Sequence, residues 1–373
     1  MLTEESRLQD FPALADMTYL NTAAESIPPV CVHEALAQYA RDKGLGMRGR
    51  VPHNETMEAC REVAARMVGL EPSEVSFCSC SSEAYNLLAN ALNLKPEDEV
   101  VITDLDFPAG ATPWLNAAAP PKVRLWKSHN GALNANDLPD LLNERTRLMQ
   151  VSLVSFFNGH RLDWTPFIEA IRTHAPQAKL AVDVTQALGR IELDCSDFDI
   201  LISSTHKWVL GVHGGSIVGI PDKGEAITTN AGGWFHLENA FETDRFDRTV
   251  RKEGALSFSV GMPNYAAIYS LNAALGYIES VGVAAIAAHA NPLVTQLEAG
   301  LEELGLTPMC PQRRGNYSGI LAIQHNRTDD IHAHLEAAEV HVMNHAGRLR
   351  MALHGYNTEA DVEKFLTELK AAL

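Results

Sequence analysis

AVDVTQALGRIELDCSDFDILISSTHKWVLGVHGG, residues 181–215, holds two apolar runs that each end in polar residues. Asp183 ends the first run, Gln186 follows three residues later, and the segment from Ser204 to Lys207 ends the second. In an open α/β sheet the polar groups at the carboxyl ends of strands line the ligand crevice, so both ends are expected to face one site. A lysine just past a buried strand is costly unless it is paired or used covalently, although the position alone would also let Lys207 turn out to solvent.

Short β-rich runs alternate with helical stretches from about residue 74 to residue 220. This alternation predicts an α/β fold whose largely parallel sheet is covered by helices on both faces. After about residue 264 a long Ala-rich helical tract (270–304) is followed by a strand, a helix, a strand and a last helix that Asn357 or Thr358 can cap. We therefore expect an N-terminal segment (1–18), a large α/β domain (19–263) and a small α+β domain (264–373).

The composition is that of a globular protein. A length of 373 residues corresponds to two domains at roughly 150 residues each. The net charge of −17 argues against a general nucleic-acid or anionic-membrane surface. No apolar stretch reaches the roughly 18 residues of a membrane span, and the start MLTEESRLQD lacks the features of a secretory signal. The six cysteines are expected to be reduced thiols and the protein to be cytoplasmic.

The pattern V-D-x-x-Q (182–186), followed by S-x-H-K (204–207), resembles the cofactor core of pyridoxal-phosphate enzymes of fold type I. More narrowly it resembles the class V aminotransferase family, which includes cysteine desulfurases, isopenicillin-N-epimerase-like proteins and kynureninase. Five further segments resemble motifs of that family in the same order: YLNTAA (19–24), FCSCSSEAYNLLA (77–89), TDLDFPAGATPW (103–114), FSVGMPN (258–264) and GRLRMALHGYNTEADV (347–362). Their order over nearly the whole chain carries the resemblance.

The resemblance implies roles for the residues around the cofactor ring. Lys207 would bind the cofactor covalently and later move the α-proton of the substrate. Asp183 would pair with the pyridine nitrogen, so that the ring can withdraw electrons from the substrate. Gln186 would donate a hydrogen bond to the ring's 3-oxygen. Phe107 stands where relatives often have a stacking histidine, so an apolar side chain would cover the ring.

Other residues would bind the two anionic groups of cofactor and substrate. Ser81 and Ser82 open a predicted helix, whose free amides suit a phosphate, and Ser204 and His206 would complete the phosphate site. Arg350 would bind the substrate α-carboxylate through two parallel hydrogen bonds. Taken alone, each has a simpler explanation: a helix cap for the serines, core packing for Phe107 and a surface charge for Arg350.

The cofactor core does not choose the reaction. Cysteine desulfurases of the family need a loop cysteine shortly before the carboxylate arginine, and this chain has none after Cys310. We therefore expect a lyase that cleaves a C–S or other Cβ–X bond of an α-amino acid through a carbanion, with an aminotransferase or epimerase as alternatives and a persulfide-type desulfurase less favoured. Met262 replaces the threonine that in relatives reaches the partner subunit's phosphate, and His345 stands where some relatives have a second arginine.

Two readings of another class remain: a non-catalytic binding protein, and a nicotinamide-dependent oxidoreductase suggested by GLGMRG (44–49). That glycine run follows a helix-like stretch, not a strand, so a substrate-entry loop with Arg48, Arg50 or His53 near the pocket is favoured. The run from Gly232 to His236 is expected to shape side-chain specificity. No zinc-type ligand pattern occurs, so no metal is expected. The resemblance also implies a homodimer with the site at the interface.

Overall fold

The computed structural model describes residues 1–224, 226–310 and 316–373. The strands of its largest sheet are β2 (Val75–Cys78), β3 (Glu99–Thr103), β4 (Lys122–Trp126), β5 (Thr146–Ser152), β6 (Lys179–Asp183), β7 (Ile200–Ser204) and β8 (Ser216–Gly219). Their order is β2-β8-β7-β6-β5-β3-β4. β8 is antiparallel to both of its neighbours, and the remaining pairs are parallel. The predicted α/β fold with a mostly parallel sheet is confirmed.

The strand directions bring the predicted site residues together. Because β2, β3, β5, β6 and β7 run the same way, their carboxyl ends meet along one edge of the sheet. Asp183 and Ser204 are the last residues of β6 and β7, Ser81 begins the helix that follows β2, and Phe107 lies between β3 and the next helix. The ligand crevice of an open α/β sheet forms at this edge.

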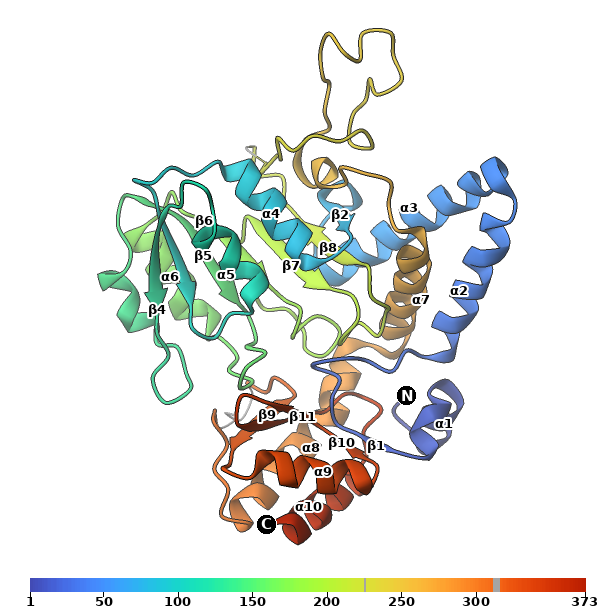
Figure 1. Ribbon diagram of the computed structural model, residues 1–373, viewed down its shortest axis with the longest axis vertical. Coiled ribbons are helices and arrows are strands. Elements are labelled where there is room, and N and C mark those ends of the chain that lie inside the picture. The colour runs from blue at the N-terminus through green and yellow to red at the C-terminus, as the bar shows by residue number, and fades with distance from the viewer. Residues whose placement is uncertain (225, 311–315) are drawn as a thin grey trace.

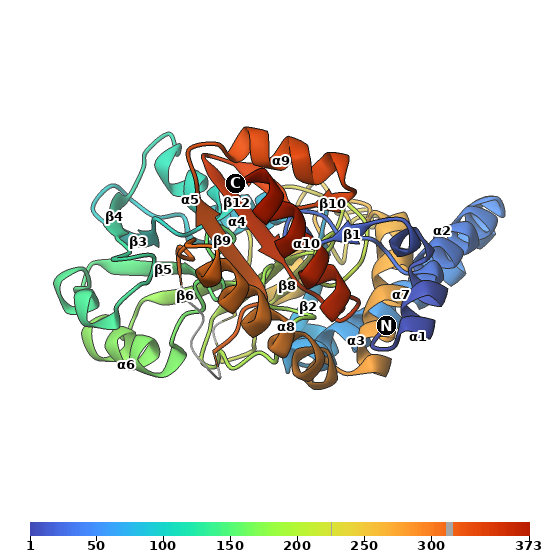
Figure 2. The ribbon, with the colours of Figure 1, turned by 90° about the horizontal axis from the view of Figure 1, so that it is seen from below.

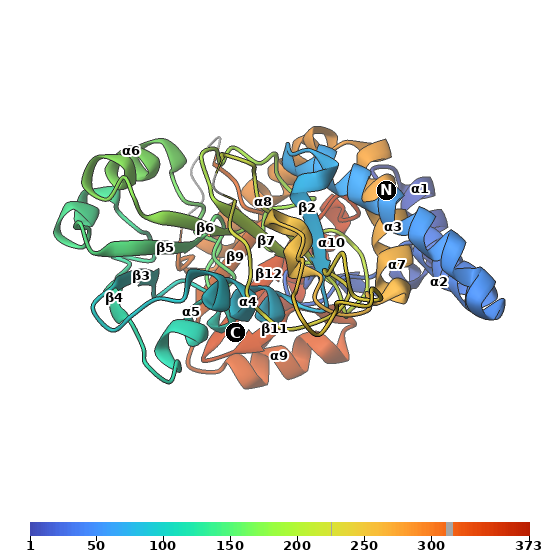
Figure 3. The same ribbon diagram turned by 90° about the horizontal axis from the view of Figure 1, so that it is seen from above.

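Helices cover both faces of this sheet. They are α3 (Arg50–Val68), α4 (Ser81–Leu92), α5 (Pro108–Leu115), α6 (Trp164–His174) and α7 (Tyr265–Val281). Successive residues of a strand point to opposite faces. In β3, Val100 and Ile102 pack into the core shared with α4 and α5, whereas Val101 packs into the core shared with α3, α6 and α7. Figure 3 shows α4 and α5 on one side of the sheet and α6 on the other.

The C-terminal part forms a second, smaller layer below the large sheet (Figures 1 and 2). Its strands are β9 (Ile320–Gln324), β10 (Val340–His341), β11 (Met343–His345) and β12 (Arg348–Ala352), and its helices are α8 (Val283–Glu303), α9 (Thr328–Ala337) and α10 (Glu359–Ala372). The antiparallel sheet β11-β12-β9 packs with these helices into a core of its own. Thr358 caps α10 through a capping box with Asp361, as one of the two predicted alternatives.

The N-terminal segment joins this smaller layer to the large one. After α1 (Glu4–Asp10), strand β1 (Thr18–Tyr19) pairs in parallel with β10, and α2 (Val30–Lys43) then packs against α7. Since α7 also packs against α3, it lies with the helices of the large layer. The domain boundary at residue 264 stays a prediction.

The sequence predicted one long helical tract over residues 270–304. The structure divides it into two helices, α7 and α8. Gly282 has a φ of 89°, a conformation that glycine adopts readily, and α7 and α8 meet there at a bend of 74°. Among the residues that the structure describes, no single helix is long and apolar enough to cross a membrane, and only this bent pair satisfies the length and composition together.

Candidate active site

A cavity of about 240 Å³ lies at the carboxyl edge of the large sheet. All the residues predicted to bind the cofactor line it: Ser81, Ser82, Phe107, Asp183, Gln186, Ser204, His206 and Lys207. They come from four different strand ends, which explains why they are scattered over more than a hundred positions of the sequence. Among the other lining residues are Ser152, Phe156, Thr185 and His213, which the motifs did not indicate.

Lys207 is half-buried and supplies the amine that lines the cavity. Burial lowers the pKa of its ammonium group from 10.5 to about 8, the Asp183 carboxylate opposes this shift, and the Arg350 guanidinium adds to it. The amine lies 5.1 Å from the centre of the Phe107 ring, whose side chain is half-exposed at the cavity. A lysine with a lowered pKa supplies more of the neutral, nucleophilic amine near neutral pH.

Asp183 is held by two hydrogen bonds. Its Oδ1 accepts from the backbone amide of Thr185 at 2.8 Å, and its Oδ2 accepts from the Tyr85 hydroxyl at 3.0 Å. The Tyr85 hydroxyl in turn accepts from Nε2 of Gln150 at 3.2 Å. Tyr85 was not predicted, yet it lies four residues after Ser81 on α4 and so shares a helix face with it.

The first turn of α4 supplies free amides at the other end of the cavity. Cys80 is the cap residue, and among the described residues no side chain accepts hydrogen bonds from these first amides. The Ser204 hydroxyl donates to the Ser81 hydroxyl at 3.1 Å, so both oxygens lie beside the helix start. A helix N-terminus with uncapped amides and adjacent hydroxyl groups suits a phosphate.

Two stacked histidines border the same region. The rings of His206 and His213 are 4.4 Å apart and nearly parallel, and Nε2 of His213 lies 3.0 Å from the Glu25 carboxylate. Burial and the neighbouring Lys207 lower the pKa of His206 to about 4. His206 is therefore uncharged near neutral pH and contributes hydrogen bonding, not positive charge.

Gln186 has most of its hydrogen-bonding capacity committed inside the protein. Its Nε2 donates to the carbonyl oxygen of Ala23 at 3.0 Å, and its Oε1 accepts from the Trp208 indole at 2.6 Å. One N–H of the amide is left to face a ligand. The predicted bond to the 3-oxygen of the ring can use only this hydrogen.

Arg350 lies behind the cavity wall and is 1% exposed. Its Nη1 donates to the carbonyl oxygen of Phe156, a lining residue, at 2.6 Å. Its Nε and Nη2 are buried and have no hydrogen-bond partner among the described residues. Burial and the neighbouring Arg348 lower its pKa to about 9. Two adjacent N–H donors left open match the bidentate geometry of a carboxylate.

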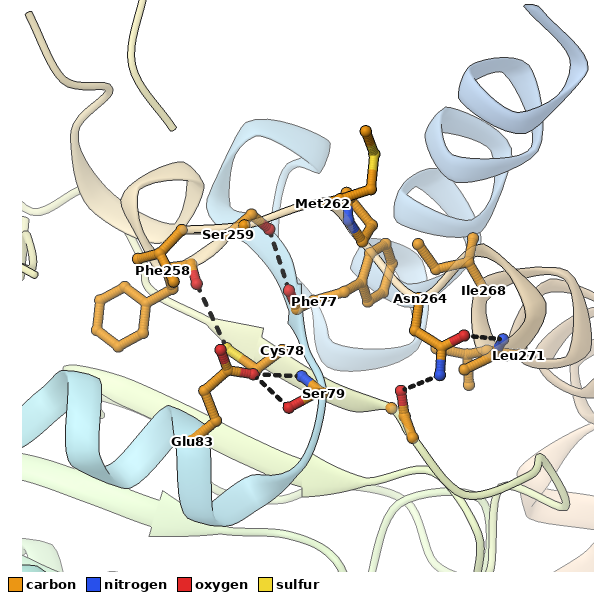
Figure 4. Close-up of a pocket in the computed structure, with 16 residues that line it drawn as sticks. Phe77, Cys78, Ser79, Glu83, Phe258, Ser259, Met262, Asn264, Ile268 and Leu271 are labelled. Carbon is orange, nitrogen blue, oxygen red and sulfur yellow. Dashed lines mark hydrogen bonds between the residues drawn. The ribbon is translucent and has the colours of Figure 1, made fainter. Parts of the chain in front are cut away.

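A second, smaller pocket of about 150 Å³ adjoins the first at Ser79, Gly214 and Gly215 (Figure 4). The segment 258–264 forms one of its walls, and Asn264 ties this segment to Gly214 by a hydrogen bond of 3.1 Å. Met262 is one of the residues that line this second pocket, and it is 44% exposed. Met262, which replaces the family's threonine, is not among the residues that line the first cavity.

The predicted substrate-entry loop lies elsewhere. Residues 46–49 form a short turn between α2 and α3, and Arg48 and Arg50 are exposed there. His53 is buried against Tyr265 at a ring distance of 4.9 Å. These side chains do not line the cavity of their own chain, and their place in a substrate-entry loop stays a prediction. The 232–236 run does not line the cavity either, and its role in specificity stays a prediction.

Comparison with known proteins places the chain in a family. The aminotransferase class-V family model matches residues 18–365. A protein of Bacillus subtilis described as an uncharacterized aminotransferase is 26% identical over 99% of this chain and 98% of its own. A cysteine desulfurase of Dickeya dadantii is 30% identical over 79% of this chain and 75% of its own.

Solved structures agree in fold. The apo cysteine desulfurase of Thermococcus onnurineus has a TM-score of 0.87 at 22% identity and covers 100% of this chain and 98% of its own. The cystine C-S lyase C-DES, in complex with cysteine persulfide, has a TM-score of 0.88 at 20% identity and covers 96% and 99%. With the motifs, the cavity and the family match in agreement, the chain belongs to the class V aminotransferase family and is a fold type I enzyme whose cofactor is pyridoxal phosphate.

Proposed function

We propose that the protein is a lyase that cleaves a C–S or other Cβ–X bond of an α-amino acid. The observation that carries this proposal is the pair of open donors on buried Arg350, next to the cavity that holds Lys207 and Asp183. Such an arrangement suits a substrate with an α-carboxylate whose reacting carbon lies beside the lysine amine.

The lining residues fit the cofactor. The uncapped first turn of α4 and the hydroxyls of Ser81 and Ser204 would hold its phosphate, and Asp183 would hold the proton of the pyridine nitrogen. Phe107 would cover the ring and exclude water from one face. When bound, pyridoxal phosphate supplies an electron-withdrawing ring that weakens the bonds at Cα of the substrate.

The proton transfers would be performed by Lys207. Its amine, with a pKa lowered to about 8, takes the proton from Cα. The electron pair of the Cα–H bond then forms a double bond to Cβ as the Cβ–S bond breaks. The sulfur leaves with its bonding electrons as a thiolate and takes up a proton, while water converts the remaining enamine into pyruvate and ammonia.

The relatives favour chemistry at sulfur. Proteins named cysteine desulfurase are 26–30% identical to this chain, and the structural neighbour C-DES is named a cystine C-S lyase. The persulfide route of the family uses a loop cysteine shortly before the carboxylate arginine, and the sequence has none after Cys310, although Cys80 lines the cavity. Direct release of a sulfur leaving group, as in a lyase, needs no such residue.

The test is product analysis of the holoenzyme with cysteine conjugates and cysteine sulfoxides. A lyase releases pyruvate and ammonia in equal amounts, measured by coupled dehydrogenase assays, and Lys207→Ala abolishes both. Absence of pyruvate across a broad panel would overturn the proposal. Release of alanine from free cysteine, with its sulfur transferred to a thiol acceptor as a persulfide and no pyruvate formed, would instead show a desulfurase.

A second candidate is an aminotransferase, which the named Bacillus subtilis relative favours because it matches nearly the whole chain. It predicts formation of the substrate's own 2-oxo acid and conversion of the cofactor to its amine form, with Cβ–X intact. Mass spectrometry of the products separates the two reactions. We also propose a homodimer, to be tested by sedimentation equilibrium of the holoenzyme.

A further inference from the structure

Two arginines lie on one face of strand β12. Arg348 and Arg350 are two residues apart in an extended strand, so their side chains leave the sheet on the same side. Each is 1% exposed. Two buried guanidinium groups side by side repel each other, and the proximity of Arg348 contributes to the lowered pKa of Arg350.

Neither charge is balanced within the described part of the protein. Arg348 donates to the carbonyl oxygens of Phe157 at 2.9 Å and His345 at 3.0 Å, and Arg350 donates to that of Phe156. No described carboxylate lies within ion-pair distance of either side chain. Nη2 of Arg348, like Nε and Nη2 of Arg350, is buried and finds no hydrogen-bond partner in residues 1–224, 226–310 and 316–373. A buried charge with open donors is costly until an anion pairs with it.

Arg348 is connected to the cavity by a row of aromatic rings. Its guanidinium carbon lies 3.9 Å from the centre of the Phe157 ring and 5.9 Å from that of Phe156. Phe156 lines the cavity and packs edge-on against Phe107 at 5.0 Å. Arg348 therefore lies at the far end of a row of rings that starts with Phe107 at the cavity and continues through Phe156 and Phe157.

We propose that Arg348 binds a second acidic group, so that the enzyme takes α-amino acids with an anionic side chain. The inference rests on the proposed function, because it assigns the α-carboxylate to Arg350 and leaves Arg348 for the side-chain anion. A carboxylate or sulfinate would accept from the open Nη2 of Arg348 and neutralise the second buried charge. Strand β12 thus supplies the arginines that bind both acidic groups of one substrate.

The test compares pairs of ligands that differ only in side-chain charge. The holoenzyme is titrated with aspartate and asparagine, glutamate and glutamine, and S-carboxymethylcysteine and its amide, and binding is followed by the visible spectrum of the cofactor. The acidic member of at least one pair binds about tenfold or more tightly in wild type. In Arg348→Met this preference falls to about one, whereas the surface control Arg66→Met retains it.

A calorimetric titration with succinate and its monoamide gives a readout that needs no reaction. Loss of the succinate preference in Arg348→Met supports the proposal, and Arg348→Lys, which keeps the charge but not the planar fork, retains part of it. Equal affinities within every pair in wild type overturn the proposal whatever the variants do, and they leave the lyase assignment untouched. Pyruvate release from neutral cysteine conjugates but not from acidic ones would also overturn the proposal and leave the lyase assignment untouched. If no amino acid changes the spectrum, the proposed function fails, and the succinate titration still decides the role of Arg348.

Discussion

The lowered pKa of Lys207 makes a prediction about how the apoprotein takes up its cofactor. Covalent attachment needs the neutral amine, because only this form has a free electron pair. With a pKa of about 8, about one molecule in eleven carries the neutral amine at pH 7, against about one in three thousand for a lysine at 10.5. Attachment at pH 7 should therefore be about 300-fold faster than that of an ordinary lysine of equal nucleophilicity.

The pH dependence follows from the sign of the shift. A lysine is protonated below its pKa, so the attachment rate should rise tenfold per pH unit up to about pH 8 and level off above it. Stopped-flow absorbance of the apoprotein mixed with pyridoxal phosphate between pH 6 and pH 10.5 measures this profile. Nα-acetyl-lysine under the same conditions corrects for the titration of the cofactor itself.

A variant checks the physical cause. Arg350 contributes to the lowered pKa of Lys207, so Arg350→Met should move the midpoint of the profile upward. Because burial is the larger cause, the midpoint should still lie well below 10.5. A wild-type rate that keeps rising to pH 10 would refute the reasoning, since it would show that Lys207 is protonated like an exposed lysine.

Three substitutions test other contacts. Tyr85→Phe removes the hydroxyl that donates to Asp183 at 3.0 Å, so the free energy of unfolding measured in urea should fall by about 1 kcal/mol. The pH titration of the cofactor spectrum should also shift. An unchanged titration would show that Tyr85 does not act on the ring nitrogen through Asp183. Ser204→Ala should weaken cofactor binding about five- to tenfold in equilibrium dialysis with unfolding unchanged, and undiminished affinity would remove Ser204 from the phosphate site. Gly159→Ala should destabilise the fold by at least about 2 kcal/mol, because φ is +79° and the added Cβ would lie 2.3 Å from the carbonyl oxygen of Ile320. Unchanged unfolding in urea would contradict that clash.

Elements that depend on local sequence were predicted closely. Helix α4 (Ser81–Leu92) begins at the serines predicted to open a helix, and β6 and β7 end at Asp183 and Ser204, where their apolar runs end. The convergence of these ends also followed from sequence, since a parallel sheet places all carboxyl ends at one edge. The pattern of strands and helices was therefore enough to locate the cavity.

Features that depend on distant partners were not predicted. The single strand expected between the last two helices is divided into β10, which pairs with β1, and β11, which pairs with β12. The burial of Arg348 depends on Phe157, which is far away in the sequence. The hydrogen bonds that occupy Gln186 come from Trp208 and Ala23. No local pattern signals such contacts, because each forms only when separate segments pack together.

The motifs near the two ends of the chain have a structural role that explains why they occur together. The Asn357 amide donates to the carbonyl oxygen of Tyr19 at 2.9 Å, and the backbone amide of Ala352 donates to that of Leu20 at 2.8 Å. The segment 19–24 is thus fixed to the end of β12, the strand that carries Arg350. The same segment presents the carbonyl oxygen of Ala23 to Gln186 in the cavity. The N-terminal motif therefore joins the strand that carries Arg350 to the sheet edge that carries Lys207. If Arg350 binds the α-carboxylate and Lys207 acts at Cα, as proposed, this connection fixes the distance between the two groups that one substrate must meet at once.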